Sequence, residues 1–566
     1  MTHPDYRPYF PFATIRDEQC KAIEFAIASF LDEGKRFVIL DMGTGTGKSV
    51  IGVTLARYLA EHGGATMSVE TNDPSSATTV DDMPVLTKGA YVLTTQKILQ
   101  QQYMDDFGPD SGCDLMRSLK SANNYCCRFY EDMRCSDSRR LLKQLGKKVE
   151  GTEFHKCCKS ACPYTLDKQE FMAHPLGITN FSYFLAETMY AKQLEPRSLL
   201  IIDEAHNIEN ELGKFVEVTF SERFAKQLGC KIPKLDTPEA VFAWIQGPYK
   251  NAVKKTLASM TKKMSAQFSA DDSDHVGLSE TSKRYEMLDK HICKVNRFIE
   301  VYNPDNWVMN YVKAPQENKH AGRKFEFKPV DVSSYGNELL YKFGSRVILM
   351  SATIIDKDIF CKSVGIDPAE TAFLHVPSPF PIANRPIHYL GVGSMSRKNI
   401  DVTLPNMTHV VKQLLSLHSV DKGMIHTVNY RIAKHLVDEI RSPRLLLHDS
   451  DNRDQMIDFH LKSPDPTVLI SPSMTEGVDL VDDASRFQIL CKVPFPYLGD
   501  QVIQLRKQKD PNWYVCQTIR SIIQAFGRSI RNDKDHATSY ILDADWEMFL
   551  KMNRRMFPDE FLAALS

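Results

Sequence analysis

The chain has 566 residues, of which 43% are apolar and 25% charged, and its formal net charge is −1. A chain of this length needs more than one hydrophobic core, so we expect two to four domains of a soluble globular protein. The near-neutral charge provides no global basic field, and any nucleic-acid site has to be a local groove. The sequence has no apolar signal segment and no long apolar run, which predicts an intracellular protein with no membrane partner.

Short apolar runs predict the strands of two α/β domains. The first set lies at 36–41, 90–95, 198–204 and 346–353, and the second at 423–427, 444–448, 467–471, 486–493 and 539–545. Helical patterns of about 10 to 15 residues separate these runs, which is typical of doubly wound parallel sheets. Two segments interrupt the first domain. Residues 113–165 are basic and rich in cysteine, and 213–340 are polar and helical in pattern, without clear strands.

The segment DMGTGTGKS follows the first apolar run and has the composition of a phosphate-binding loop. Its glycines would let backbone N–H groups approach phosphate oxygens: Gly43, Gly45 and Gly47. Lys48 would reach the β- and γ-phosphates, and the Ser49 hydroxyl would bind Mg²⁺. Met42 stands where the strict pattern has glycine, so the segment taken alone could also be a chance loop.

Two further segments carry the groups that ATP hydrolysis needs. In LLIIDEAH (199–206), a strand would deliver Asp203 to the metal ion and Glu204 to the attacking water as general base. In QAFGRSIR (524–531), Arg528 and Arg531 are three residues apart and share one helix face, from which both could reach the γ-phosphate across a cleft. A chance acidic strand end and a solvated basic helix face are the alternatives for the two segments taken singly.

More segments fall in register with these: FPFATIRDEQ (10–19), YVLTTQKILQQ (91–101), SAT (351–353), SPFPIANRPI (378–387), GMIHTVNY (423–430) and TEGVDL (475–480). The set, in this order, resembles the XPD/DinG-like, iron–sulfur-containing family of superfamily 2 DNA helicases. The resemblance implies two RecA-like doubly wound parallel-sheet motor domains, with a cysteine-rich iron–sulfur insertion and a helical arch insertion in the first. His426 departs from the family, which usually has phenylalanine there.

The resemblance also implies domain bounds and nucleotide contacts. Motor domain 1 would comprise 1–112, 166–212 and 341–385, the iron–sulfur domain 113–165, the arch 213–340 and motor domain 2 386–566. Gln19 would read the adenine, with Arg16 beside it, and Ser49 and Asp203 would hold Mg²⁺. The implied ATP contacts are Arg16, Gln19, Gly43, Thr44, Gly45, Thr46, Gly47, Lys48, Ser49, Gly477, Asp479 and Gln524.

Six of the 13 cysteines lie between 126 and 162. Thiols stay reduced inside cells, which disfavours disulfides, and four thiolates suit either zinc or a [4Fe–4S] cluster. Zinc ribbons usually show two tight Cys-x-x-Cys pairs, and neither half of the segment has one, so the spacing favours iron–sulfur over zinc. The resemblance implies an iron–sulfur cluster over both zinc and a ligand-free remnant. The resemblance implies the cluster ligands Cys127, Cys135, Cys158 and Cys162, with Cys157 as the alternative to Cys158.

The sequence therefore predicts an ATP-dependent DNA helicase that uses ATP, Mg²⁺ and a [4Fe–4S] cluster, acting on single-stranded and forked DNA. A 5′→3′ direction is implied by the resemblance alone. Two alternatives stay open. One is a translocase or remodeller of RNA–DNA hybrids without processive unwinding, and the other is a nucleic-acid clamp with a vestigial ATPase. The presence of Lys48, Glu204 and Arg528 argues against the clamp.

Overall fold

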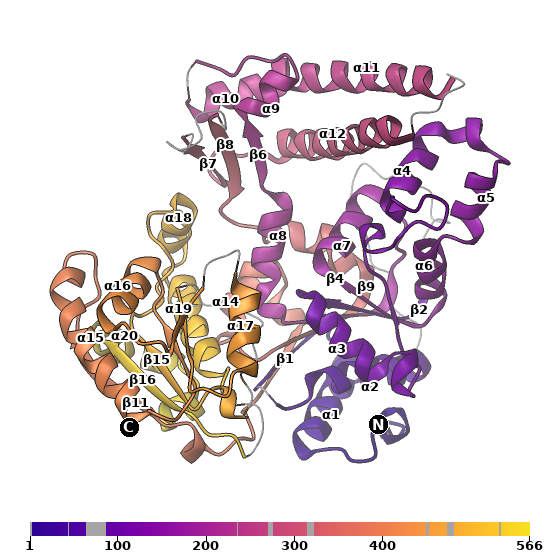
Figure 1. Cartoon of the computed structure of the whole chain (residues 1–566). Helices are drawn as coiled ribbons and strands as arrows, with labels where there is room; N and C mark the ends of the chain where they lie inside the picture. Colours follow the sequence, from indigo (N-terminus) through magenta and orange to yellow (C-terminus); the bar gives the residue numbers. More distant parts are fainter. Residues whose placement is uncertain are drawn as a thin grey trace.

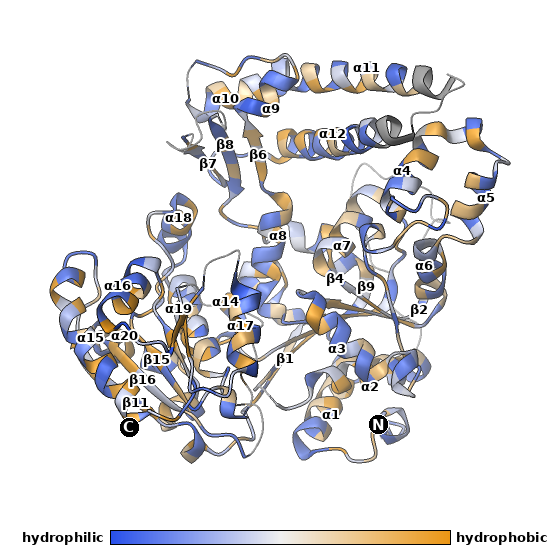
Figure 2. Ribbon diagram, viewed as in Figure 1, coloured by the Kyte–Doolittle hydropathy of each residue, from blue (hydrophilic) through white to orange (hydrophobic). Residues whose placement is uncertain are grey.

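The computed structural model describes residues 3–43, 45–63, 87–234, 236–269, 275–313, 322–448, 452–472, 480, 482–530 and 534–566. Two parallel sheets with flanking helices stand side by side, and a helical layer with a small third sheet lies above the first of them (Figure 1). Among the described residues, no helix is long and apolar enough to span a membrane. Figure 2 shows the strands of both parallel sheets coloured mostly as hydrophobic, as expected for sheets covered on both faces.

The first α/β domain is built on a seven-stranded parallel sheet in the order β10-β1-β9-β5-β2-β4-β3. Its central strands β1 and β5 are buried at every position, because helices cover both faces. The strands are β1 (Phe37–Met42), β2 (Thr87–Thr94), β3 (Arg117–Ser118), β4 (Leu176–Asn180), β5 (Arg197–Asp203), β9 (Gly344–Ser351) and β10 (Thr371–Val376). All four predicted strands of this domain are confirmed, and the sequence did not predict β3, β4 and β10.

Helices α1 and α2 pack their apolar side chains against this sheet, with Ile23 and Ile51 fully buried in one cluster with Val38. The helices of the first α/β domain are α1 (Asp17–Leu31), α2 (Lys48–His62), α3 (Lys97–Phe107), α6 (Pro163–Ala173), α7 (Phe181–Ala186), α8 (Ile208–Val216), α13 (Tyr335–Leu339) and α14 (Lys357–Val364). Both α2 and α8 begin just after a central strand, which places their N-termini at the carboxyl edge of the sheet.

The second α/β domain has a six-stranded parallel sheet in the order β11-β16-β15-β12-β14-β13. Its strands are β11 (Ile387–Gly393), β12 (Gly423–His426), β13 (Leu445–Leu447), β14 (Val468–Ser471), β15 (Phe487–Leu490) and β16 (Thr538–Asp543). Its helices are α15 (Ile400–Leu417), α16 (Tyr430–Ile440), α17 (Arg453–Lys462), α18 (Gln501–Lys509), α19 (Pro511–Phe526), α20 (Asp545–Asn553) and α21 (Asp559–Ala563). The five predicted strands are confirmed, and β11 is added.

The cysteine-rich segment forms two helices, α4 (Cys135–Leu145) and α5 (Glu153–Ser160), beside α6. We define the upper layer as residues 218–329, with α9 (Glu222–Gln227), α10 (Pro238–Trp244), α11 (Lys250–Ser269), α12 (His275–Val301) and the strands β6 (Val218–Ser221), β7 (Trp307–Val312) and β8 (Lys324–Pro329). The prediction that 213–340 lacks clear strands is wrong, because β6-β8-β7 form an antiparallel sheet. Phe220, Phe298 and Phe327 pack at its centre.

Candidate nucleotide site between the two parallel sheets

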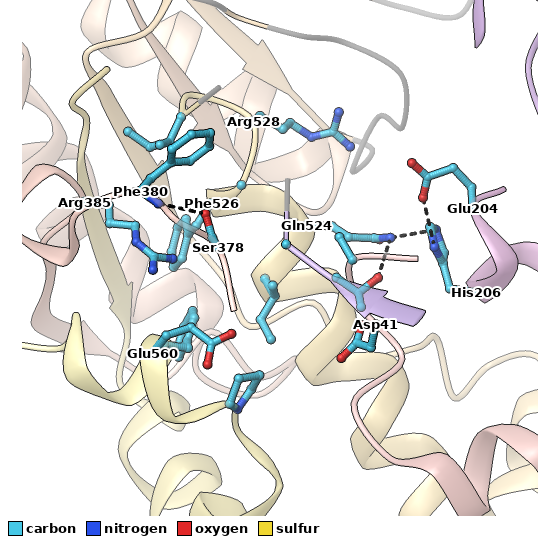
Figure 3. A pocket seen from close by; sticks show the side chains of 18 of the residues that line it. Asp41, Glu204, His206, Ser378, Phe380, Arg385, Gln524, Phe526, Arg528 and Glu560 are labelled. Carbon is cyan, nitrogen blue, oxygen red and sulfur yellow. Dashed lines mark hydrogen bonds and ion pairs between the residues drawn. The ribbon is translucent and has the colours of Figure 1, made fainter. Parts of the chain in front are cut away.

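A cavity of about 260 Å³ lies between the two α/β domains. The first domain contributes Glu204, His206 and Thr353 to its lining, and the second contributes Gln524 and Arg528. Figure 3 shows Glu204 and His206 on one side of the pocket and Gln524 extending toward them from the other side. The predicted DEAH, SAT and QAFGRSIR segments therefore meet at one place, although their sequence positions are far apart.

The phosphate-loop segment joins β1 to α2, as its sequence predicts. Gly45 and Gly47 have φ angles of 79° and 75°, in the left-handed region that favours glycine. A Cβ atom on Gly45 would lie 2.1 Å from the Phe380 ring, and one on Gly47 would lie 2.4 Å from Gln19 Nε2. Met42 is the last residue of β1 and is fully buried. Its side chain belongs to the core of the sheet, so the loop proper begins at Gly43.

The start of α1 supports this loop from the outside. Gln19 Nε2 donates to the Thr46 carbonyl at 3.1 Å, and Arg16 Nη1 donates to the Gly45 carbonyl at 2.6 Å. Gln19 Oε1 in turn accepts from the Arg16 backbone N–H at 3.1 Å, which completes the first turn of α1. Both side chains thus contact the loop backbone, and adenine recognition by Gln19 stays a prediction.

Asp203 ends β5 beside the loop and is buried. Tyr103, on α3, donates its hydroxyl hydrogen bond to Asp203 Oδ2 at 3.0 Å. Burial raises the pKa of Asp203 to about 6, and the neighbouring Glu204 charge adds to this, while Lys48 opposes it. Lys48 Nζ donates to the Met42 carbonyl at 3.2 Å. The site therefore combines a lysine with a buried carboxylate whose charged form is held by Tyr103, a residue that sequence reasoning missed.

His206 connects the two domains through both of its ring nitrogens. Nδ1 lies 2.9 Å from Ser351 Oγ and 3.2 Å from Glu204 Oε2, and Nε2 lies 2.7 Å from Gln524 Nε2. The amide nitrogen of Gln524 can only donate, so His206 Nε2 accepts and Nδ1 carries the proton. Gln524 Nε2 also donates to Thr353 Oγ1 at 3.3 Å. The side-chain amide of Gln524 thus contacts the DEAH segment and the SAT segment at the same time.

The remaining predicted nucleotide contacts are placed only in part. Arg528 is 7% exposed and lines the cavity on the second-domain side. It lies in the turn after α19, which ends at Phe526, so the prediction that it stands on a helix face is wrong. Gln524 lies in the cavity too, but its partners here are His206 and Thr353. The predicted site residues Thr44, Gly477, Asp479 and Arg531 lie outside the described residues.

A histidine bridge adjoins the phosphate loop and was not predicted from the sequence. His375, at the end of β10, binds Asp41 Oδ2 through Nδ1 at 2.8 Å and Glu560 Oε1 through Nε2 at 3.3 Å. Asp41 also accepts the Ile354 N–H at 3.0 Å. Hydrogen bonds to Asp41 and Glu560 raise the pKa of His375 to about 10. The imidazolium therefore links β1 and β10 of the first domain to α21 of the second.

The thiols of the cysteine-rich segment differ in their burial. Cys135, Cys158 and Cys162 are buried, Cys127 and Cys157 are half-buried, and Cys126 is exposed. Cys127 Sγ accepts hydrogen bonds from the Phe129 N–H at 3.3 Å and the Ser138 hydroxyl at 2.8 Å. Burial raises the pKa of Cys135 and of Cys158 to about 12, and the charge of Cys127 adds to both shifts.

These residues fit a cluster in donor type, since the segment supplies several thiols and Cys127 Sγ already accepts N–H and O–H bonds. Within the described ranges, however, no three His, Cys, Asp or Glu side chains are placed so that they could hold a metal ion. The four-ligand set, and the choice of Cys158 over Cys157, stay predictions. The greater burial of Cys158 favours it as the ligand of the pair.

Comparison with known proteins finds two matching family models and several similar helicases. Residues 95–224 match the family described as DEAD_2, and 411–561 match the one described as "Helicase C-terminal domain". The ATP-dependent DNA helicase XPD of Sulfolobus acidocaldarius is 21% identical over 484 residues, which cover 79% of this chain and 83% of that protein. The regulator of telomere elongation helicase 1 homolog of Caenorhabditis elegans is 28% identical over 102 residues, and the match spans only 10% of that relative.

Solved structures agree in fold. A structure titled "XPD_Helicase" matches with a TM-score of 0.61 at 14% identity, over 96% of this chain and 98% of the other. S. tokodaii Xpd4 matches with a TM-score of 0.56 at 13% identity, over 97% and 99%. The two parallel sheets are thus two RecA-like domains, as the sequence predicts. The phosphate loop, the DEAH segment and the QAFGRSIR segment meet at the cavity between these domains, and the chain is similar in sequence and fold to the XPD-like superfamily 2 helicases.

Proposed function

We propose that this protein is an ATP-dependent DNA helicase that translocates 5′→3′ along single-stranded DNA inside the cell. The observation that carries the proposal is the contact of Gln524 with both His206 and Thr353, because it joins the hydrolysis segment of one domain to the other domain. A change in the nucleotide beside Glu204 would shift His206, which contacts Glu204, and His206 would in turn shift Gln524 of the second domain. Domains that open and close in this way can alternate their grip on a strand.

ATP would bind on the phosphate loop, with backbone N–H groups and Lys48 around its phosphates. Ser49 and Asp203 would hold Mg²⁺, which supplies positive charge against the β- and γ-phosphates when it is bound. Glu204 would accept a proton from the attacking water, and Arg528 and Arg531 would stabilise the charge that develops on the γ-phosphate. His206, whose Nδ1 contacts Glu204, orients that carboxylate.

We propose the same division of the chain that the sequence predicts. Residues 1–112, 166–212 and 341–385 form motor domain 1, 113–165 the cluster domain, 213–340 the arch and 386–566 motor domain 2. The cluster domain and the arch would meet the fork and split the duplex. Contacts between α4 and α12 support this, since they join the cysteine-rich segment to the upper layer and leave one continuous body above the first sheet.

The cluster would be held by Cys127, Cys135, Cys158 and Cys162, with Cys157 as the alternative to Cys158. A [4Fe–4S] cluster would supply a covalent cross-link between the segment before α4 and the α5–α6 turn, which share no regular sheet or disulfide in the described structure. Protein purified without oxygen should be brown and contain about four iron atoms per chain. A colourless protein with stoichiometric zinc would contradict the assignment.

The helicase proposal is tested with the ATPase and unwinding reactions side by side. We expect single-stranded DNA to stimulate ATP hydrolysis, Glu204→Gln to abolish hydrolysis while ATP still binds, and forked DNA with a 5′ tail to be unwound in preference to a 3′ tail. Absence of DNA stimulation would sink the proposal. Stimulation without strand separation on forked DNA or RNA–DNA hybrids would instead favour a translocase.

A further inference from the structure

Arg506, on α18 of motor domain 2, lies in a buried junction of three parts of the chain. Its side chain is 5% exposed and forms two ion pairs, one to Glu209 Oε1 at 3.1 Å and one to Asp331 Oδ2 at 3.0 Å. Its guanidinium also stacks on the Trp513 ring, 5.4 Å from the ring centroid. Neither carboxylate belongs to motor domain 2, so every charged partner of this ion-pair set is reached across a domain boundary.

The two carboxylates come from different bodies. Glu209 is the second residue of α8 and follows His206 of the DEAH segment by three positions. Asp331 follows β8 at the base of the upper layer, where its backbone exchanges two hydrogen bonds of 3.0 Å with the Asn306 side chain. Lys509, at the end of α18, adds a third contact by donating to the Asp305 carbonyl at 2.8 Å. Figure 1 shows α18 rising from the second domain toward β7, β8 and α8.

Helix α19 connects this junction to the nucleotide site. Near its first turn, Trp513 Nε1 donates to Glu209 Oε2 at 2.8 Å. Near its other end, Gln524 contacts His206 at 2.7 Å. A straight helix of 16 residues spans about 24 Å, so it can transmit a displacement over that distance. The same helix therefore contacts His206 at one end, and Glu209 and Arg506 of the ion-pair set at the other end.

A buried ion-pair set of this kind fixes an orientation more than it adds stability. Taking an arginine and two carboxylates out of water costs more than their mutual attraction reliably returns, whereas losing one partner leaves a buried charge uncompensated. The junction therefore favours one arrangement of α18, α8 and the upper layer over neighbouring arrangements. Motor domain 2 cannot rotate away from motor domain 1 without breaking the contacts to Glu209, to Asp331 or to both.

We propose that Arg506 is a positioning residue that ties the upper layer to motor domain 2, so that closing and opening of the ATP cleft moves the upper layer against the strand it separates. The inference rests on the proposed helicase function. It adds a specific claim: the upper layer is inserted between strands of motor domain 1 but follows motor domain 2.

The test uses one variant on each side of the junction, Asp331→Asn at the base of the upper layer and Lys509→Met on α18, in the full chain with its cluster. Neither residue touches the nucleotide cavity. We expect single-stranded-DNA-stimulated ATP hydrolysis to stay within about twofold, and base pairs unwound per ATP to fall about tenfold for Asp331→Asn, which corresponds to about 1.4 kcal/mol of lost coupling. Lys507→Met is the matched control, because Lys507 lies on the same helix but stacks on Tyr514 of its own domain.

A second measurement detects the coupling without any unwinding. Amide hydrogen exchange of β7 and β8 should change when Mg²⁺, ADP and beryllium fluoride are added to the wild type, and should not change in Asp331→Asn. Wild-type-like unwinding per ATP in both variants, or equal loss of hydrolysis and unwinding, would overturn the inference. An unchanged exchange pattern in the wild type would do so as well. A failure of the helicase proposal itself is distinguishable, because the wild type would then show no stimulation of ATP hydrolysis by single-stranded DNA.

Discussion

Replacing Tyr103 with phenylalanine removes one hydroxyl group from a buried position on α3 and keeps the ring. That hydroxyl donates to Asp203 Oδ2 at 3.0 Å and thereby favours the charged carboxylate. The pKa of Asp203 already stands at about 6, because burial and the charge of Glu204 outweigh Lys48 and Tyr103. Without the hydroxyl, the carboxylate loses one of the groups that keep it ionised. We therefore expect its pKa to rise further.

The size of the effect follows from the strength of the bond. A hydrogen bond to a charged group contributes about 1.5–3 kcal/mol, and a pKa difference of one unit corresponds to about 1.36 kcal/mol. The pKa of Asp203 should therefore rise by about 1 to 2 units. A carboxylate that is protonated in more of the molecules binds Mg²⁺ less well. The Mg²⁺ concentration needed for half-maximal ATP hydrolysis should rise by about two- to tenfold at neutral pH, and less at high pH.

The assay is DNA-stimulated ATP hydrolysis as a function of pH and of Mg²⁺ concentration, at saturating ATP. In Tyr103→Phe, the acid limb of the rate should move to higher pH, and excess Mg²⁺ should restore most of the rate. Tyr58→Phe is the control, because the Tyr58 hydroxyl bonds the Pro4 carbonyl in the same domain, far along the chain from Asp203. An unmoved acid limb together with an unchanged Mg²⁺ requirement would refute the role given to Tyr103.

Three other predictions follow from the same structure. Gln524→Leu removes the donor to His206 and should lower kcat for ATP hydrolysis about tenfold with little change in KM for ATP, so a rise in KM alone would contradict it. Cys126→Ser should keep the visible absorbance of the cluster and Cys135→Ser should lose it, because Cys135 is buried whereas Cys126 is exposed. His375 has a folded pKa of about 10 against an ordinary value of 6.5, so its contribution to stability is complete below pH 6.5 and is lost as pH rises through 10. The midpoint of urea unfolding should therefore fall less over this range in His375→Gln than in the wild type.

The strands that the sequence predicted are those with continuous apolar runs, such as 36–41 and 467–471, because a strand buried on both faces needs no polar positions. The strands it missed have weaker signals. β4 contains Gly177, whose Cβ would lie 2.6 Å from the Phe171 ring, so close packing forces a residue that is poor in strands. β10 is an edge strand and carries His375 near its end. Tertiary packing accounts for Gly177 and His375 in these strands, and the local sequence pattern contains no information about that packing.

The upper-layer strands were missed for a different reason. KFEFKP alternates charged and aromatic residues, and Phe325 and Phe327 are buried while their neighbours face outward. This is the period of a strand with one covered face, which an antiparallel sheet allows. The signal was present, but the polar composition of the whole segment and its long helical runs outweighed it. A count of alternating positions would have found β8.

Site residues divide in the same way. Lys48, Asp203 and Glu204 follow from short patterns, because the chain itself places a loop or a carboxylate at the end of a strand. Tyr103 and His375 do not, since their partners Asp203 and Asp41 are 100 and 334 positions away. No spacing rule connects such pairs, and only the packing of the sheet brings them together.

Helix α19 shows why the long-range contacts matter for function. It ends two residues before Arg528, and the sequence predicted a function only for that end of the helix. In the structure, Gln524 near one end of the helix contacts His206 of the DEAH segment, and Trp513 near the other end contacts Glu209, three residues further along the chain. Because α8 begins two residues after His206, the two docking points belong to one short stretch of motor domain 1. A nucleotide-driven movement that breaks the contact of Gln524 with His206 must therefore displace Trp513 relative to Glu209. The ion pairs of Arg506 with Glu209 and Asp331 would pass this displacement to the base of the upper layer.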